Sequence, residues 1–288
     1  MPTPELPAGP PEGWYPDPAG RWRFRHWDGT RWTDWVSNGS WVAAEKLPQV
    51  EPDQRASLPL RAIWWGIGGI VAGEIIGLLL FLLARWISDD RKVVELVVSQ
   101  LGLWSGFTGA IVIASRRYGT GHVFRDFGVR VRKHDVWLGL GFSLAARILG
   151  IVALLPIVIA FRHYFEHAPS ADGVLGVDQD DRAALITVAV IAAIGAPFIE
   201  ELLFRGLILG SLRRLGGFWS VAIQGVLFAS VHMQVAFGRT NILTFVAILA
   251  GGIVLGWCAH RYKRLGPGMW THFFFNLLAV GILLGTAF

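Results

Sequence analysis

Long apolar blocks alternate with short polar loops from residue 63 to the end of the chain. An α-helix needs about 20 apolar residues to cross the hydrocarbon core of a membrane. Seven stretches approach or reach that length: residues 63–86, 93–115, 136–161, 183–204, 218–232, 242–259 and 269–288. The pattern predicts an all-α polytopic membrane protein with about seven transmembrane helices, of which the fifth is short.

The first 58 residues follow a different pattern. They contain no apolar run of ten residues, which argues against a secretory signal. The turn signals Pro16-Asp17-Pro18 and Asp28-Gly29 flank an alternating stretch at residues 23–27, which predicts a β mini-domain of two or three strands over residues 1–41. Six of the 14 tryptophans lie here and are expected to supply its core: Trp14, Trp22, Trp27, Trp32, Trp35 and Trp41. Residues 42–59, with three prolines, are predicted to be a flexible linker to a membrane domain at 60–288.

Composition agrees with the membrane assignment. Hydrophobic residues make up 53% of the chain and charged residues 16%, whereas soluble domains carry about 25% charged residues. The net charge is +5, but the basic residues sit in short loops, which favours a role in membrane topology and not a nucleic-acid partner. The single cysteine, Cys258, excludes a disulfide framework and a cysteine-cluster metal site.

Loop charges predict the orientation of the spans. The loops after the second, fourth and sixth spans are basic, and the loop after the third is acidic. Since basic loops stay in the cytoplasm, the N-terminus is predicted inside and the C-terminus outside. No internal repeat is evident in the sequence, which weighs against a transporter built from inverted repeats.

Two acidic residues stand out inside the membrane region. Glu200 and Glu201 are the only acids after Asp181, and they lie in the apolar run at 192–209. A charge in the membrane costs roughly 3 kcal/mol and usually faces the interior of the bundle, where it has a function. Arg205 follows Glu201 by four residues, so the two are expected to form an ion pair on one helix face.

Two further charged residues in the spans are Glu74 in the first and Arg147 in the third. They are expected to form a structural salt bridge across helices.

Two pairs with i,i+4 spacing accompany the glutamates. Phe228 precedes His232, and His272 precedes Asn276. If the fourth helix turns at residues 215–217, Glu200 lies 16 residues before Gly216 and His232 lies 16 residues after it. Antiparallel helices would then bring both side chains to the same height, about 24 Å from the turn. The depth of His272 depends on where the Gly266-Pro267-Gly268 loop sits.

These residue types are suited to hydrolysis of an amide. Glu200, with His232 nearby, could take a proton from water, and His272 and Asn276 could donate hydrogen bonds to the oxyanion. In the alternative, His232, His272 and Glu200 bind zinc, which supplies the activated water. Zinc is the one cofactor that these residues suggest. The competing functions are a proton- or cation-coupled transporter and a non-catalytic membrane scaffold.

The three motifs resemble those of the CAAX-protease and bacteriocin-processing family of intramembrane proteases, relatives of the type II CAAX prenyl endopeptidase. The family pattern is Glu-Glu-x-x-x-Arg, Phe-x-x-x-His and His-x-x-x-Asn, found here at residues 200–205, 228–232 and 272–276. The resemblance implies an intramembrane endopeptidase of the bacterial cell membrane with a catalytic core at about 183–288. Its substrate would be a membrane-associated protein or peptide. Glu200, His232, His272 and Asn276 would line the site, supported by Glu201, Arg205 and Phe228.

The N-terminal segment resembles a tryptophan-rich domain of unknown function found at the cytoplasmic ends of actinobacterial membrane proteins. The matching residues are Gly13-Trp14-Tyr15-Pro16-Asp17-Pro18, Arg25, Trp27-Asp28-Gly29 and Trp32-Thr33. The resemblance implies a docking module for an unidentified cytoplasmic partner, with no chemistry of its own.

Overall fold

The computed structural model describes residues 10–18, 20–45, 55–87, 91–165, 181–233 and 241–287. The chain divides between Asp53 and Gln54 into two compact units. The first contains strands and the second contains helices. Their boundary falls inside the predicted linker, residues 42–59.

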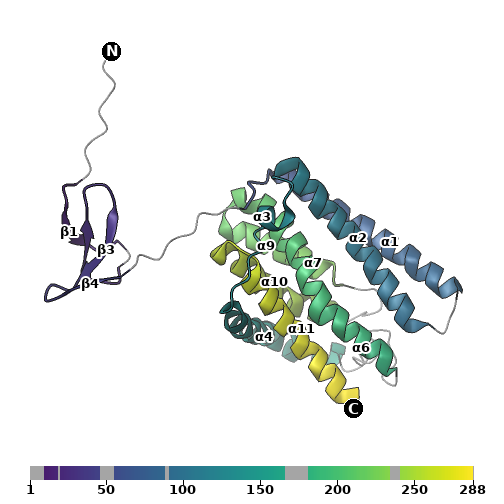
Figure 1. Ribbon diagram of the computed structural model, residues 1–288. Helices are drawn as coiled ribbons and strands as arrows, with labels where there is room; N and C mark the ends of the chain where they lie inside the picture. The colour runs from purple at the N-terminus through teal and green to yellow at the C-terminus, as the bar shows by residue number, and fades with distance from the viewer. Residues whose placement is uncertain are drawn as a thin grey trace. The chain divides into compact units, whose positions relative to one another are not determined.

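The N-terminal unit is a four-stranded antiparallel sheet: β1 (Gly13–Pro16), β2 (Phe24–Trp27), β3 (Trp32–Ser37) and β4 (Val42–Ala44). The strands pair in chain order (Figure 1). The sequence predicted two or three strands ending at residue 41, and β4 is the addition. It forms because the turn before it is closed by Ser37, whose Oγ accepts from the Gly39 N–H and donates to the Trp41 carbonyl. Gly39 has a φ of 102°, which suits glycine.

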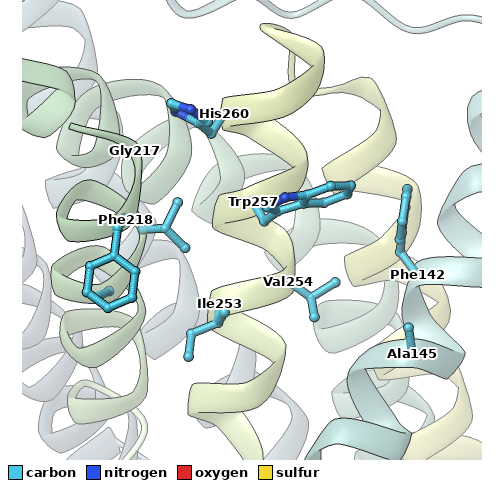
Figure 2. Close-up of a pocket in the computed structure, with 10 residues that line it drawn as sticks. Phe142, Ala145, Gly217, Phe218, Ile253, Val254, Trp257 and His260 are labelled. Carbon is cyan, nitrogen blue, oxygen red and sulfur yellow. The ribbon is translucent and has the colours of Figure 1, made fainter.

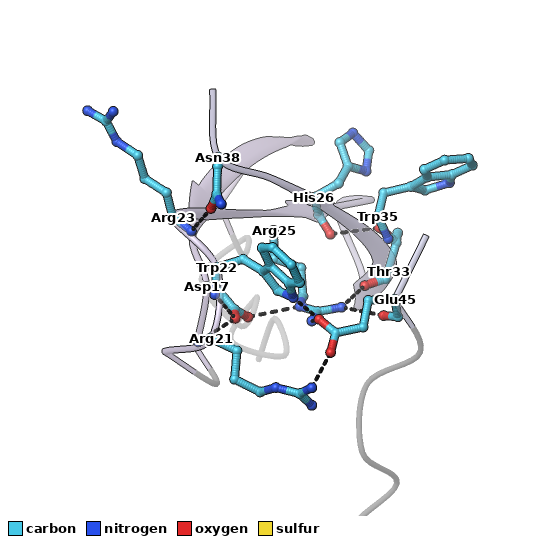
Figure 3. Close-up of polar contacts among 10 residues, drawn as sticks. All are labelled: Asp17, Arg21, Trp22, Arg23, Arg25, His26, Thr33, Trp35, Asn38 and Glu45. Atoms are coloured by element: carbon cyan, nitrogen blue, oxygen red, sulfur yellow. Dashed lines mark hydrogen bonds and ion pairs between the residues drawn. The ribbon is translucent and has the colours of Figure 1, made fainter. Parts of the chain in front are cut away.

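The buried centre of this sheet unit is formed by the ion pair of Arg25 and Asp17, and not by a cluster of tryptophans (Figure 3). Arg25 is fully buried, and its Nε donates to Asp17 at 2.9 Å. Its Nη1 donates to the carbonyl oxygens of Thr33 and Glu45, both at 3.0 Å. A single small sheet has no second layer to cover all of its aromatic side chains. Three tryptophans that were expected in the core are therefore exposed: Trp14, Trp35 and Trp41.

The C-terminal unit is helical, and Figure 1 labels most of its helices. It begins with η1 (Leu60–Ala62), α1 (Ile63–Ile87), α2 (Lys92–Tyr118), α3 (Val123–Phe127), α4 (Asp135–Ala160) and α5 (Arg162–Phe165). One long helix of changing pitch follows, made of α6 (Arg182–Val190), η3 (Ile191–Gly195), α7 (Ala196–Glu200), η4 (Glu201–Ile208), α8 (Leu209–Leu212) and η5 (Arg213–Leu215). The last helices are α9 (Gly217–Ser230), α10 (Asn241–Tyr262) and α11 (Gly266–Ala287).

Among the described residues, five helices are long and apolar enough to cross a membrane. They are Leu60–Ile87, Lys92–Tyr118, Asp135–Ala160, Arg182–Leu215 and Asn241–Tyr262. The prediction of an all-α polytopic membrane protein is thereby confirmed. Each of the seven predicted stretches forms a helix, and α9, with 14 residues, is the short fifth one. The number of helices that cross the membrane and the orientation of the termini stay predictions.

The long helix from Arg182 to Leu215, called the central helix below, carries most of the buried core. Every residue from Glu200 to Leu212 is buried. α1 packs on α2 and also contacts the central helix, where a Cβ atom on Gly66 would lie only 2.7 Å from Ile208 Cγ1. A segment buried on all sides is where a membrane bundle can hold charged side chains.

The expected salt bridge between Glu74 and Arg147 does not form. α4 packs on α10 and α11, so Arg147 lies beside α11. There its guanidinium donates to the Phe275 carbonyl and lies 4.5 Å from the centre of the Phe275 ring. Glu74 lies on an exposed side of α1. The pairing of helices, which the apolar pattern does not specify, decides the partners of both residues.

Candidate active site

Glu200 lies in the middle of the central helix, between two π-helical segments. In η3 the Ala196 N–H bonds to the Ile191 carbonyl, and after η4 the Leu209 N–H bonds to the Phe204 carbonyl, five residues back in each case. π-helical segments are rare and frequently occur at functional sites. The helix therefore departs from regular α geometry at the point where the sequence places its two glutamates.

The first π-helical segment has a cause in the sequence and a consequence for Asn276. Pro197 follows Ala196 and has no N–H, so in the five-residue pattern the carbonyl of Ala192 has no donor from its own helix. Asn276, from α11, supplies one: its Nδ2 donates to the Ala192 oxygen at 2.7 Å. This bond holds the Asn276 amide against the central helix and leaves it a second N–H to donate.

The side chains of His232 and His272 approach the same carboxylate oxygen of Glu200. Glu200 Oε2 lies 4.0 Å from His232 Nε2 and 3.8 Å from His272 Nε2. This oxygen is buried and has no hydrogen-bond partner among the described residues. Both distances are too long for direct hydrogen bonds, and a water molecule between the groups would satisfy all three.

Each histidine ring is held through its Nδ1 atom. His232 Nδ1 lies 2.7 Å from the carbonyl oxygen of Phe228, and His272 Nδ1 lies 3.1 Å from Glu201 Oε1. A carbonyl and a carboxylate can only accept, so we infer that Nδ1 carries a hydrogen in both rings. Nε2 of each ring then faces Glu200.

The meeting of Glu200 and His232 follows from the turn between the central helix and α9. Gly216, with a φ of 85°, joins the two helices, and each side chain is 16 residues from it. The expected approach of these two residues is confirmed by their 4.0 Å separation. His232 lies just past the end of α9, in a turn closed by its N–H bond to Ala229.

His272 reaches the same point because α11 begins inside the protein. Gly266, Pro267 and Gly268 are all buried. A Cβ atom on Gly268 would lie 2.8 Å from Glu201 Oε2, so only glycine lets α11 approach this carboxylate so closely. The sequence did not predict the depth of the Gly266-Pro267-Gly268 loop. Because the loop is buried, His272 lies beside both glutamates.

Glu201, Arg205 and Phe228 support the two histidines. Glu201 and Arg205 are buried and form the expected ion pair, with 3.0 Å between Oε1 and Nη1. The pair is not aligned as a hydrogen bond, and no nitrogen of the Arg205 guanidinium has a hydrogen-bond partner in the described part of the chain. Instead the guanidinium lies over the Phe228 ring, 4.1 Å from its centre. The centre of the Phe228 ring is also 4.6 Å from that of His232 and 5.7 Å from that of His272.

A further acidic residue, Glu74 of α1, lies at the depth of Glu200. Gly66 of α1 contacts Ile208 of the central helix. Glu74 lies eight residues after Gly66, and Glu200 lies eight residues before Ile208. Eight residues correspond to about 12 Å along a helix, so both glutamates lie at about the same distance from the contact. Glu74 interacts electrostatically with His232. Sequence reasoning assigned Glu74 to a salt bridge and missed this proximity. The equal spacing from a Gly66–Ile208 contact would have revealed it, had the helix pairing been known.

His232, His272 and Glu200 are also the candidate zinc ligands. Their Nε2 atoms face one carboxylate while Nδ1 is held by an acceptor, as is usual for metal-binding histidines. However, the separations of 3.8 and 4.0 Å exceed the roughly 3.3 Å between tetrahedral ligands with bonds of about 2.0 Å. Within the described ranges, no group of three histidines, cysteines or acids is placed to hold a metal ion. The described residues therefore do not fit a tetrahedral zinc site.

Residues 182–278 match the family model of type II CAAX prenyl endopeptidase Rce1-like proteins. This stretch contains every predicted site residue. The resemblance based on three motifs is thereby confirmed, and the chain carries a domain of the CAAX-protease and bacteriocin-processing family. Neither a curated protein nor a solved structure matches the chain. The identity of the tryptophan-rich N-terminal unit stays a prediction.

Proposed function

We propose that the protein is an intramembrane endopeptidase that hydrolyses a peptide bond of a membrane-associated protein or peptide, with Glu200 as the base that activates water. The observation that carries this proposal is the buried Oε2 of Glu200, which has no hydrogen-bond partner in the described part of the chain and lies within 4.0 Å of two histidine Nε2 atoms. The match to type II CAAX prenyl endopeptidases supports the reaction type.

In the proposed first step, a water molecule lies between Glu200 Oε2 and His232 Nε2 and donates a hydrogen to each. Glu200 takes one proton while the water oxygen bonds to the carbonyl carbon of the substrate, whose C=O electron pair moves onto its oxygen. The Phe228 carbonyl fixes the His232 ring for this role by accepting from Nδ1.

The proposed oxyanion donors are His272 and Asn276, one turn apart on α11. Asn276 donates the N–H that does not bond to Ala192. In the proposed step His272 donates a hydrogen from Nε2, and Glu201 holds the ring at Nδ1. The C–N bond then breaks, and Glu200 returns its proton to the leaving amine. Glu201 is a positioning residue that acts through His272.

The test is a Glu200→Gln variant, which keeps the size of the side chain and removes the base. Membrane proteins from cells that express wild type or Glu200→Gln would be compared for new N-termini by mass spectrometry. We expect cleavage to fall by at least about a hundredfold with normal insertion. The matched control is Glu95→Gln, which neutralises a buried carboxylate of α2 outside the site. Unchanged cleavage in Glu200→Gln contradicts the proposal, and proton-coupled flux in liposomes would favour a transporter instead.

The zinc alternative is tested by metal analysis of the purified full-length protein. We expect no stoichiometric metal and no inhibition by chelators, because Glu200 itself activates the water. One equivalent of zinc that is lost in His232→Ala and tracks activity would contradict this mechanism. It would leave the assignment as a protease unchanged.

A further inference from the structure

A cavity outside the proposed active site lies between α4, α9 and α10 (Figure 2). Its volume is about 580 Å³, within the range of small-molecule sites. Phe142 of α4, Val221 of α9, and Ile253 and Trp257 of α10 form apolar walls. His260, at the end of the cavity next to Gly217, is the one ionisable side chain among the lining residues. The cavity is therefore suited to a hydrocarbon chain with a polar group at one end.

This cavity is separate from the proposed active site. Gly217 begins α9 and lines the cavity, whereas His232 follows the opposite end of that helix. The 14 residues of α9 separate the two ends by about 20 Å. None of the cavity-lining residues contributes to the site around Glu200.

Two arginines are close in sequence to the residues at the His260 end of the cavity. Arg261 is exposed, and its guanidinium lies 5.8 Å from the centre of the Tyr262 ring. The Tyr262 ring is in turn 6.1 Å from that of Phe142 in the cavity wall. Arg214, also exposed, precedes Gly217 by three residues.

No acidic residue of this part of the chain offsets these cations. The sequence has no acid after Glu201. Asp135, at the start of α4, is already paired with Arg264 at 2.6 Å. Arg261, next to His260 in the chain, and Arg214, three residues before Gly217, thus give the chain around this end of the cavity an excess of positive charge that is complementary to an anion. These three residues, Arg214, His260 and Arg261, are called the rim.

We propose that this cavity binds one acyl chain of an anionic phospholipid, with the phosphate held at the rim by Arg214, His260 and Arg261. The apolar walls remove the chain from contact with polar groups, and the rim attracts the headgroup. Lipid headgroup sites in membrane proteins take this form, as basic pockets between transmembrane helices at one membrane surface. The proposal does not depend on the proteolytic function.

The test measures lipid retention by the full-length protein in detergent, using native mass spectrometry. The probes are phosphatidylglycerol and phosphatidylcholine with the same acyl chains. We expect wild type to retain phosphatidylglycerol preferentially. Ala145→Phe, which fills the cavity from an exposed position on α4, should weaken retention at least about tenfold, roughly the contribution of two buried CH₂ groups. Ala72→Phe, on an exposed position of α1, is the matched control and should have no effect.

The rim is tested by Arg261→Gln, which does not change the packed helices. It should reduce the preference for phosphatidylglycerol about fivefold. Lys133→Gln, which removes an exposed charge just before α4, should leave the preference unchanged. Equal retention of the two lipids by wild type, or equal effects in Ala145→Phe and Ala72→Phe, would mean ordinary surrounding lipid and overturn the proposal. If Ala145→Phe does not fold, Arg261→Gln decides.

Discussion

Both units of the chain bury an arginine beside a carboxylate, and the two arginines are satisfied in different ways. In the sheet unit, Arg25 donates hydrogen bonds to the Asp17 side chain and to two backbone carbonyls. In the helical unit, Arg205 lies 3.0 Å from Glu201, yet none of its nitrogens has a hydrogen-bond partner among the described residues. It lies over the Phe228 ring instead.

The difference indicates that Arg25 has a structural role, whereas the charges around Arg205 are available to bind a ligand. Buried polar groups in proteins nearly always have partners, because an unpaired one is costly to bury. Arg25 meets this rule at Nε and Nη1, through Asp17 and two backbone carbonyls, and its Nη2 lies 3.6 Å from the Glu45 carboxylate in an ion pair. Around Arg205 several exceptions lie close together, since Glu200 Oε2 and Glu201 Oε2 are also buried and have no hydrogen bond to any described residue. Such a cluster beside two histidines is typical of a site that binds a polar ligand.

The largest expected effect is that of Arg205→Ala. Removing one partner of a buried ion pair leaves Glu201 with an uncompensated charge, which costs about 3–5 kcal/mol. We expect a low folded yield in detergent, measured by size-exclusion chromatography and thermal unfolding. The double variant Glu201→Gln with Arg205→Met removes both charges and should recover the yield without recovering activity. An Arg205→Ala protein that folds normally and is inactive would place Arg205 in the chemistry.

Arg25→Ala tests the other side of the comparison. It leaves Asp17 buried without its partner, at a cost of the same order, about 3–5 kcal/mol. A sheet this small has little stability to lose, so the N-terminal unit should unfold. Limited proteolysis and tryptophan fluorescence of the full-length protein would detect the change. Arg23→Ala, at an exposed position of the same stretch, should change stability by less than about 0.5 kcal/mol. Equal resistance of the two variants would show that the buried pair does not hold the sheet.

Asn276→Ala tests the proposed oxyanion donor of the helical unit. It removes a proposed oxyanion donor and leaves the base Glu200 in place, so hydrolysis should fall by about a hundred- to a thousandfold, mostly in kcat. The neighbouring Leu277→Ala changes an exposed apolar side chain and serves as the control. A rise in KM with unchanged kcat would mean that Asn276 binds substrate and does not stabilise the oxyanion.

The sequence predicted the helices well because most of the apolar runs were long enough to indicate a helix; only the fifth, now α9, was short. It also predicted the approach of Glu200 and His232, because both are 16 residues from Gly216. It could not predict which helices pack together, and the Glu74–Arg147 salt bridge was wrong for that reason. The bond from Asn276 to Ala192 depends on a π-helical segment next to Pro197, which hydrophobic periodicity does not reveal.

The N-terminal unit was predicted less well. β4 has only three residues, too few to show the alternation of a strand, and it follows a turn whose closure depends on the Ser37 side chain. The aromatic residues suggested a tryptophan core, whereas the buried centre is Arg25, a residue type that is almost never fully buried without a partner. A partner such as Asp17 becomes evident only once the strands are paired.

The smallest expected effect is that of Glu74→Gln, which tests how far the charge cluster of the active site extends. Glu74 lies on an exposed side of α1 and interacts with His232 electrostatically, without a hydrogen bond or a close ion pair between these two described residues, so we expect it to contribute less than about 1.4 kcal/mol. Since 1.4 kcal/mol corresponds to a tenfold change, hydrolysis should change by less than about tenfold, with normal folded yield. The measurement is kcat/KM beside Glu200→Gln in the same assay. If Glu74→Gln is as inactive as Glu200→Gln, then Glu74 is a member of the catalytic machinery, and the unpartnered charges that define the site include one on α1.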